Sequence, residues 1–229
     1  LAFCAATARE LGASRIGLIA PYLAYMRQDR RFHLGEAVSS HLFSRQLSSL
    51  IDWLITVDPH LHRIADLSKV YTVPAVAIHA APLLADWIKA SVTAPMLIGP
   101  DEESAQWVAA VADRAGAPYI VLEKHRHGDR DVEVLMPATI ARWRDHTPVL
   151  IDDIISTART MIEALGHLHR EGMKPVVCVG VHAIFATGAF DALRAAGAAR
   201  IVTANTISHE TNAIDVTSAI GEAAAVLMG

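Results

Sequence analysis

The densest group of reactive side chains in this chain lies in the segment PVLIDDIISTARTM, residues 148–161. Its opening apolar run ends at two adjacent carboxylates, Asp152 and Asp153. Adjacent carboxylates repel each other unless a ligand binds them. The vicinal hydroxyls of a ribose are a suitable ligand, because they donate hydrogen bonds and carboxylates accept such bonds strongly. A predicted helix follows, and the free N–H groups and positive dipole end of a helix start attract phosphate. Three hydroxyl side chains accompany that helix start: Ser156, Thr157 and Thr160. The segment therefore predicts a binding loop for ribose 5-phosphate.

An alternative interpretation is that Asp152, Asp153 and Ser156 only cap the helix that follows them. Capping accounts for one acidic residue near a helix start, but not for two carboxylates placed directly after an apolar run. The ribose-phosphate interpretation is therefore favoured, and the predicted loop also includes Ala158 and Arg159.

Two further segments carry groups that could bind phosphates or metals. Residues 27–30 read RQDR, and such a cluster after a strand can hold a polyphosphate, or can simply form ion pairs at the surface. His60 and His62, with an acid nearby, could bind zinc, but no further set of cysteines and histidines completes such a site.

These residues need a scaffold, and the hydrophobic pattern indicates short strands alternating with longer helices. This alternation predicts an α/β fold with mostly parallel sheets flanked by helices, and ligands bind beyond the carboxyl ends of such strands. Residues 123–131 are predicted to be a charged loop. Strands are expected at 15–20, 53–57, 75–78, 95–98, 119–122, 132–135, 148–151, 176–181 and 200–204, and helices at 1–11, 36–50, 82–90, 102–115, 160–171, 189–196 and 218–228.

Composition excludes several classes of protein. The chain has 229 residues, of which 52% are hydrophobic, so it can bury a full core. Its 20 Lys and Arg against 24 Asp and Glu give a net charge of −4, which argues against nucleic acid as a partner. Its uncharged stretches are shorter than the ~20 residues of a membrane span, so we expect a soluble, cytoplasmic protein without a membrane partner. Cys4 and Cys178 lie in apolar surroundings and are predicted to be buried structural thiols.

Several segments, in order along the chain, resemble one known family. DDIISTART resembles the ribose-phosphate loop of type I phosphoribosyltransferases and of ribose-phosphate pyrophosphokinases. The pyrophosphokinases are favoured because PYLAYMRQDR resembles their ATP-contacting segment and EKHRHGDRD their catalytic flexible loop. Asp58-Pro59-His60 resembles their Asp-Leu-His motif, and Gly99-Pro100-Asp101 their Ser-Pro-Asp motif.

The resemblance implies a role for each matching residue. Lys124 and Arg126 would stabilise the transition state, and His60 and Asp101 would serve Mg²⁺, the implied cofactor. ATP would be bound by Arg27, Gln28, Asp29 and His60, and ribose 5-phosphate by Asp152, Asp153 and residues 156–160.

The same resemblance implies the reaction and the architecture. The chain would transfer the diphosphoryl group of ATP to the 1-hydroxyl of ribose 5-phosphate, giving phosphoribosyl pyrophosphate (PRPP) and AMP. It would contain two type I phosphoribosyltransferase-like domains, an incomplete first one over residues 1–75 on the ATP side and a second over 76–229 on the ribose 5-phosphate side. A homo-oligomer is implied because a neighbouring subunit would complete the ATP site.

Some positions depart from the family pattern. Ala158 and Arg159 replace the usual glycines of the phosphate loop, and an arginine there could strain a backbone that needs positive φ. Glu102 and Glu103 also replace glycines. In addition, the chain opens inside a predicted helix, so we expect an upstream part to be missing. These departures leave two alternatives open, a non-catalytic regulatory subunit of synthetase type and a phosphoribosyltransferase that consumes PRPP.

Overall fold

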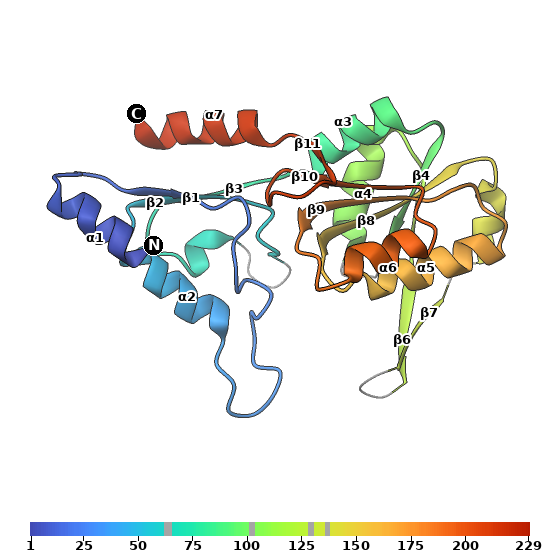
Figure 1. The fold of residues 1–229 in the computed structure, drawn as a ribbon, viewed down its shortest axis with the longest axis horizontal. Helices are drawn as coiled ribbons and strands as arrows, with labels where there is room; N and C mark the ends of the chain where they lie inside the picture. The colour runs from blue at the N-terminus through green and yellow to red at the C-terminus, as the bar shows by residue number, and fades with distance from the viewer. Residues whose placement is uncertain (62–65, 101–103, 128–130, 136–137) are drawn as a thin grey trace. The chain divides into compact units, whose positions relative to one another are not determined.

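The computed structural model describes residues 1–61, 66–100, 104–127, 131–135 and 138–229. The chain forms two compact units, one made of Leu1–His79 with Thr217–Gly229 and the other of Ala80–Val216. Each unit contains a parallel sheet and helices, so the predicted α/β fold class is confirmed (Figure 1). The division into two phosphoribosyltransferase-like domains at residues 75 and 76 stays a prediction.

The first unit is built on a three-stranded parallel sheet in the order β1-β2-β3. Every residue of the central strand β2 is buried, because helix α2 packs on one face of the sheet and helix α7 on the other (Figure 1). A strand covered on both faces is expected to be apolar throughout, as WLITV nearly is. The elements of this unit are α1 (Ala2–Glu10), β1 (Gly17–Ile19), α2 (Ser39–Ser48), β2 (Trp53–Val57), the 3₁₀ turn η1 (Leu67–Lys69), β3 (Ala75–Ile78) and α7 (Thr217–Met228).

The second unit is built on a six-stranded parallel sheet in the order β11-β10-β9-β8-β4-β5. Helices α5 and α6 cover one face, where they bury the main apolar cluster, and α3 and α4 pack together on the other face (Figure 1). Its elements are α3 (Ala81–Ser91), β4 (Pro95–Gly99), α4 (Ala105–Ala115), β5 (Tyr119–Val121), the 3₁₀ helix η3 (Ala138–Trp143), β8 (Thr147–Ile155), α5 (Arg159–Arg170), β9 (Val177–Ala183), α6 (Ala189–Ala195), β10 (Arg200–Ala204) and β11 (Asn212–Ile214).

A hairpin of two antiparallel strands, β6 (Glu123–His127) and β7 (Asp131–Leu135), stands apart from the six-stranded sheet (Figure 1). The prediction of a loop over residues 123–131 is therefore wrong for residues 123–127 and for Asp131. Five residues of β6 pair with β7, and this pairing satisfies backbone polar groups that a loop would leave to water.

Two other strands differ most from expectation. Strand β8 continues to Ile155 instead of ending at residue 151, because β9 beside it supplies partners as far as Ala183. The short strand β11 was not predicted at all. Among the described residues, no helix is both long and apolar enough to cross a membrane.

The two cysteines have different environments. Cys178 lies buried in β9, as predicted, and desolvation raises the pKa of its thiol to about 12. The prediction of burial is wrong for Cys4, which is exposed because α1 buries Ala5 and turns the side chains around it to solvent.

Candidate active site

The two carboxylates of the predicted ribose site lie near the carboxyl end of β8. Asp152 and Asp153 are both half-buried, and the backbone N–H of Asp153 donates to Oδ1 of Asp152 at 2.9 Å. Asp152 is in register with Gly180 of β9, where an added Cβ would lie 2.7 Å from the side chain of Ile155. The absence of a side chain at Gly180 therefore lets β8 and β9 pack closely directly beside the acid pair.

The predicted phosphate loop, residues 156–160, joins β8 to α5. Its positive-φ residue is Ala158, with φ 56° and ψ 8°, and Arg159 begins the helix in an ordinary helical conformation. The backbone strain that was predicted at Arg159 therefore lies at Ala158 instead. Ala158 is the N-cap of α5 and no side chain caps this helix. The interpretation of the acids as caps is wrong for this reason, and the first N–H groups of α5 have no partner within the helix.

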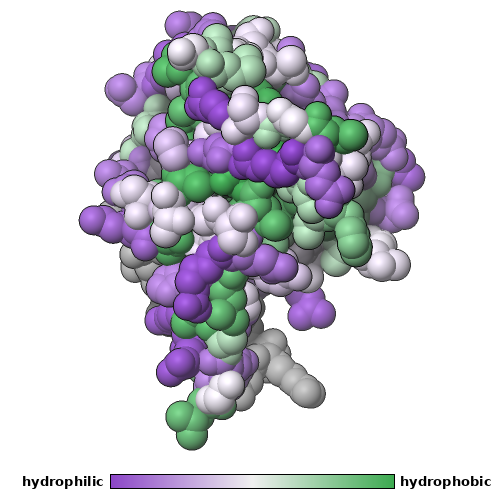
Figure 2. Space-filling view, turned by 90° about the vertical axis from the view of Figure 1, so that its left-hand side faces the viewer, coloured by the Kyte–Doolittle hydropathy of each residue, from purple (hydrophilic) through white to green (hydrophobic). Residues whose placement is uncertain are grey.

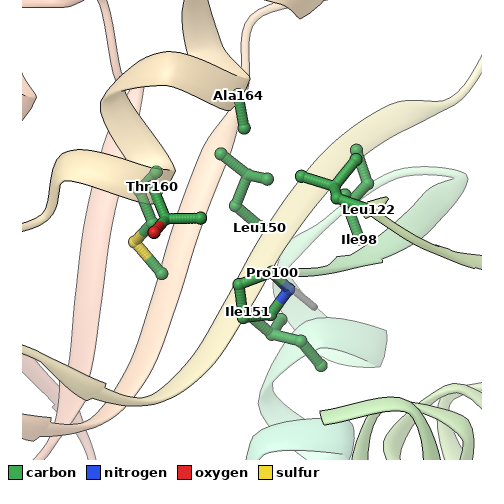
Figure 3. Close-up of a pocket in the computed structure, with 8 residues that line it drawn as sticks. Ile98, Pro100, Leu122, Leu150, Ile151, Thr160 and Ala164 are labelled. Carbon is green, nitrogen blue, oxygen red and sulfur yellow. The ribbon is translucent and has the colours of Figure 1, made fainter. Parts of the chain in front are cut away.

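An apolar hollow lies directly behind this loop (Figure 3). Thr160, in the first turn of α5, is the polar side chain among its lining residues, and none of the described residues that line it is charged. These described residues form an apolar floor behind the loop. The lining residues belong to β4, β8 and α5 or directly follow β4 and β5: Ile98, Pro100, Leu122, Leu150, Ile151, Thr160, Met161 and Ala164.

The remaining predicted residues of this unit are only partly described. Lys124 and Arg126 occupy alternate positions of β6, in register with Val134 and Val132 of β7, so the two positions belong to the same face of the strand. Asp101, the predicted Mg²⁺ ligand, lies outside the described residues. Glu102 and Glu103, which replace glycines of the family pattern, also lie outside them.

In the first unit, the predicted ATP-contacting segment begins directly after β1. The N–H of Val57, at the end of β2, donates to the carbonyl oxygen of Pro21 at 3.0 Å, which ties this segment to the carboxyl edge of the sheet. Arg27 is exposed and Asp29 is half-buried. Oε1 of Gln28 accepts a hydrogen bond from the hydroxyl of Ser39 at the start of α2, so the amide N–H groups of Gln28 are the atoms suited to bind a phosphate.

His60 is carried by a strained turn at the carboxyl end of β2. Asp58 and His60 both have positive φ, at 33° and 56°, and the N–H of His60 donates to the carbonyl oxygen of Asp58 at 2.8 Å. The N–H of Asp58 donates to the carbonyl oxygen of Ile78 at 2.9 Å, which ties the turn to β3. The structure thus brings His60 and the segment after β1 to the same edge of the first sheet.

A second histidine, His79, lies at this edge and was missed by the sequence analysis. Its Nδ1 is 3.4 Å from Oδ1 of Asp58, and this hydrogen bond raises the pKa of His79. Its position directly after β3 could have indicated it, since Asp58, which precedes His60 by two residues, directly follows β2. In the described part of the chain, no group of three or more His, Cys, Asp or Glu side chains could hold a metal ion, and His62 lies outside that part.

The comparisons with known proteins agree with one another. A family model described as "Phosphoribosyl transferase domain" matches residues 66–219. A ribose-phosphate pyrophosphokinase of Methanopyrus kandleri is 36% identical over 224 residues, which cover 97% of this chain and 75% of the relative. One of Saccharolobus solfataricus is 32% identical, over 94% of this chain and 75% of the relative. The crystal structure of phosphoribosylpyrophosphate synthetase from Mycobacterium smegmatis superimposes with a TM-score of 0.81 at 21% identity, covering 99% of this chain and 76% of that one.

Proposed function

Because this chain belongs to the ribose-phosphate pyrophosphokinase family, we infer that it makes PRPP and AMP from ATP and ribose 5-phosphate. In this reaction the oxygen of the ribose 1-hydroxyl attacks the β-phosphorus of ATP. A new O–P bond forms, the bond between the β-phosphorus and the oxygen of AMP breaks, and the hydroxyl proton is released. The observation that carries this function is the similarity to these enzymes over almost the whole chain.

We propose that the end of β8 and the loop after it bind ribose 5-phosphate. Asp152 and Asp153 would accept hydrogen bonds from the ribose hydroxyls, which suits two half-buried carboxylates at a strand end. The phosphate would bind the uncapped N–H groups at the start of α5 together with the hydroxyls of residues 156, 157 and 160. The exposed guanidinium of Arg159 could reach the same phosphate.

We propose that ATP is bound by residues of the first unit. The exposed Arg27, the amide of Gln28 and His60 supply donors for its phosphates, and Asp29 would orient a neighbouring guanidinium. Lys124 and Arg126 would neutralise the charge that moves between ATP and AMP in the transition state.

Mg²⁺ is the proposed cofactor, with His60 and Asp101 as its protein ligands. This ion keeps several waters and usually takes one or two carboxylates together with substrate phosphates, which suits Asp101. The role of His60, whose imidazole offers a nitrogen ligand, follows from the family resemblance. It would supply positive charge on the phosphates of ATP.

A homo-oligomer is also proposed. Among the described residues, all exposed large hydrophobic side chains except Tyr119 belong to the first unit, where hydrophobic residues lie among hydrophilic ones (Figure 2). These side chains would be available for contact with a second copy of the chain. These residues are Leu1, Phe3, Leu11, Ile19, Tyr25, Phe32, Leu34, Leu42, Val226 and Met228.

The function is tested by measuring AMP release from ATP and Mg²⁺, with and without ribose 5-phosphate, on the full-length protein. We expect AMP that depends on ribose 5-phosphate, together with an equal amount of PRPP. Lys124→Ala should lower turnover by about 10²–10³-fold, because it removes one group that stabilises the transition state, while ribose 5-phosphate still binds. Lys89→Ala, which removes an exposed lysine from the last turn of α3, is the matched control and should keep full activity.

Two results would contradict the proposal. Full turnover by Lys124→Ala would show that Lys124 has no catalytic role. No AMP from the wild-type protein, with ribose 5-phosphate or PRPP still binding, would favour a regulatory subunit or a phosphoribosyltransferase.

A further inference from the structure

His182 is a buried histidine in β9 to which the reaction described above gives no role. Its side chain is almost fully buried, with only 1% of the residue surface exposed. A histidine in such a position needs hydrogen-bond partners, because an unsatisfied polar group in the interior costs free energy. Nδ1 of His182 lies 2.9 Å from the hydroxyl oxygen of Thr206, which is itself buried and follows β10.

The direction of this hydrogen bond follows from the other contact of Thr206. The hydroxyl of Thr206 donates its single proton to the carbonyl oxygen of Val181, at 3.0 Å. Its oxygen must therefore accept from His182, which fixes the imidazole tautomer with a proton on Nδ1. The two side chains link the end of β9 to the loop that follows β10.

The same part of β9 holds the backbone of the proposed ribose 5-phosphate site. His182 is in register with Ile154, the residue that directly follows Asp153. Further along, the N–H of Ile184 donates to the carbonyl oxygen of Ile155, and the N–H of Ala186 donates to that of Ser156, both at 3.1 Å. Residues 182–186 therefore support the end of β8 and the first residue of the phosphate loop from one side.

We propose that His182, held by Thr206, is a positioning residue for ribose 5-phosphate, a role that rests on the function proposed above. It does not contact the substrate. It holds residues 182–186 in position, and these residues bind the carbonyl groups of Ile155 and Ser156. In this way it positions Asp152, Asp153 and the phosphate loop. A buried histidine that only filled the core would affect folding stability and leave the affinity of the folded enzyme for its substrates unchanged.

The test is a set of variants of the full-length enzyme, each measured by steady-state kinetics and by calorimetric binding of ribose 5-phosphate. Thr206→Val keeps the shape of the side chain but removes the hydroxyl that contacts Nδ1 of His182 and the carbonyl oxygen of Val181. We expect the KM and Kd for ribose 5-phosphate to rise about tenfold, as for the loss of one buried hydrogen bond. The KM for ATP should stay unchanged, and Thr206→Ser should restore the wild-type value.

A second pair of variants changes the histidine itself. His182→Asn retains an N–H donor close to the position of Nδ1 and should bind ribose 5-phosphate more tightly than His182→Leu, which has no donor. The matched control is Thr56→Val in β2. In the described structure, the hydroxyl of Thr56 is buried without a hydrogen-bond partner, so its removal should leave the affinity for ribose 5-phosphate unchanged.

The outcomes separate this proposal from the function on which it rests. If Thr206→Val unfolds at a lower temperature while its KM and Kd for ribose 5-phosphate equal those of the wild type, the pair is only structural and the proposal is wrong. A parallel rise of the KM for both substrates would also contradict it. A wild-type protein that binds ribose 5-phosphate but releases no AMP would refute the synthetase function, and the calorimetric comparison would still decide the role of His182. A wild-type protein that does not bind ribose 5-phosphate would refute both.

Discussion

At the scale of single residues, Ala158 shows how the phosphate loop tolerates a side chain where glycine is the easier choice. Its φ of 56° lies in the left-handed region, which costs a residue with a Cβ about 1 kcal/mol. A glycine would avoid this strain in the folded state but would lose a similar amount through the greater entropy of the unfolded chain. The two effects nearly cancel, so alanine is an acceptable residue at the start of α5.

Cys178 is expected to make folding stability depend on alkaline pH. Burial raises the pKa of its thiol to about 12, whereas a thiol in the unfolded chain ionises near ~8.5. The stability that the neutral, buried thiol contributes is therefore fully present below pH ~8.5 and is lost as the pH rises toward 12, because only the unfolded chain releases its proton there. We expect the free energy of unfolding to fall more steeply between pH 8 and 10.5 in the wild type than in Cys178→Ala, as measured by urea denaturation.

The exposed Cys4 supplies the control for this prediction. Cys4→Ala should retain the steep wild-type dependence on pH, and a thiol reagent at pH 8 should modify Cys4 in the native protein but Cys178 only after unfolding. Equal pH slopes in the wild type and Cys178→Ala would contradict the prediction.

At the scale of elements, the strands that consist of one short apolar run were the easiest to predict from the sequence. β2 and β3 have the predicted bounds, because a short apolar run between turn residues is sufficient to define a parallel strand. The continuation of β8 begins with Asp152 and Asp153, which interrupt the apolar run, so it carries no such local signal and is strand only because β9 pairs with it. For the same reason β6 was predicted as a loop and β11 was missed.

The close packing of β8 and β9 gives an element-scale prediction at Gly180. In Gly180→Ala the new methyl group would meet the buried side chain of Ile155 at 2.7 Å, so Ile155 and the strand must shift. We expect a loss of about 1–3 kcal/mol of folding stability, typical of overpacking, with a higher KM for ribose 5-phosphate because Ile155 directly precedes the phosphate loop. Thermal unfolding and kinetics measure the two effects.

The control for Gly180 is Gly221→Ala in α7. An added Cβ at Gly221 meets no heavy atom within 4 Å, so this variant should gain about 0.5–1 kcal/mol from the higher helix propensity of alanine. The steric argument would be wrong if both glycine variants were equally stable or if Gly180→Ala bound ribose 5-phosphate like the wild type.

At the scale of the whole molecule, the path of the chain is the feature that the sequence pattern predicts least. The last helix, α7, was correctly predicted as a helix, but its pattern does not indicate which unit it belongs to. The structure assigns residues 217–229 to the first unit, although the whole second unit, Ala80–Val216, separates them from the rest of it in sequence. Long-range packing of this kind depends on the matching of two apolar surfaces, which no local spacing encodes.

The return of α7 predicts a stability effect confined to one unit. Ile220, Ala224 and Leu227 pack against Trp53 and Ile55 of β2, so a charge at position 227 would separate the helix from the sheet. We expect Leu227→Asp to destabilise the first unit by about 1–3 kcal/mol and to accelerate amide hydrogen exchange in β2 and β3. Exchange in β8 and β9 should stay at the wild-type rate, because these strands belong to the second unit.

The neighbouring residue provides the matched control for this prediction. Val226 is 80% exposed on the same helix turn, so Val226→Asp introduces the same charge without removing a packed side chain. It should leave exchange in both units unchanged. If Leu227→Asp accelerated exchange equally in β2 and in β8, the two units would unfold together, and the helix would contribute to the stability of the whole chain rather than to that of one sheet.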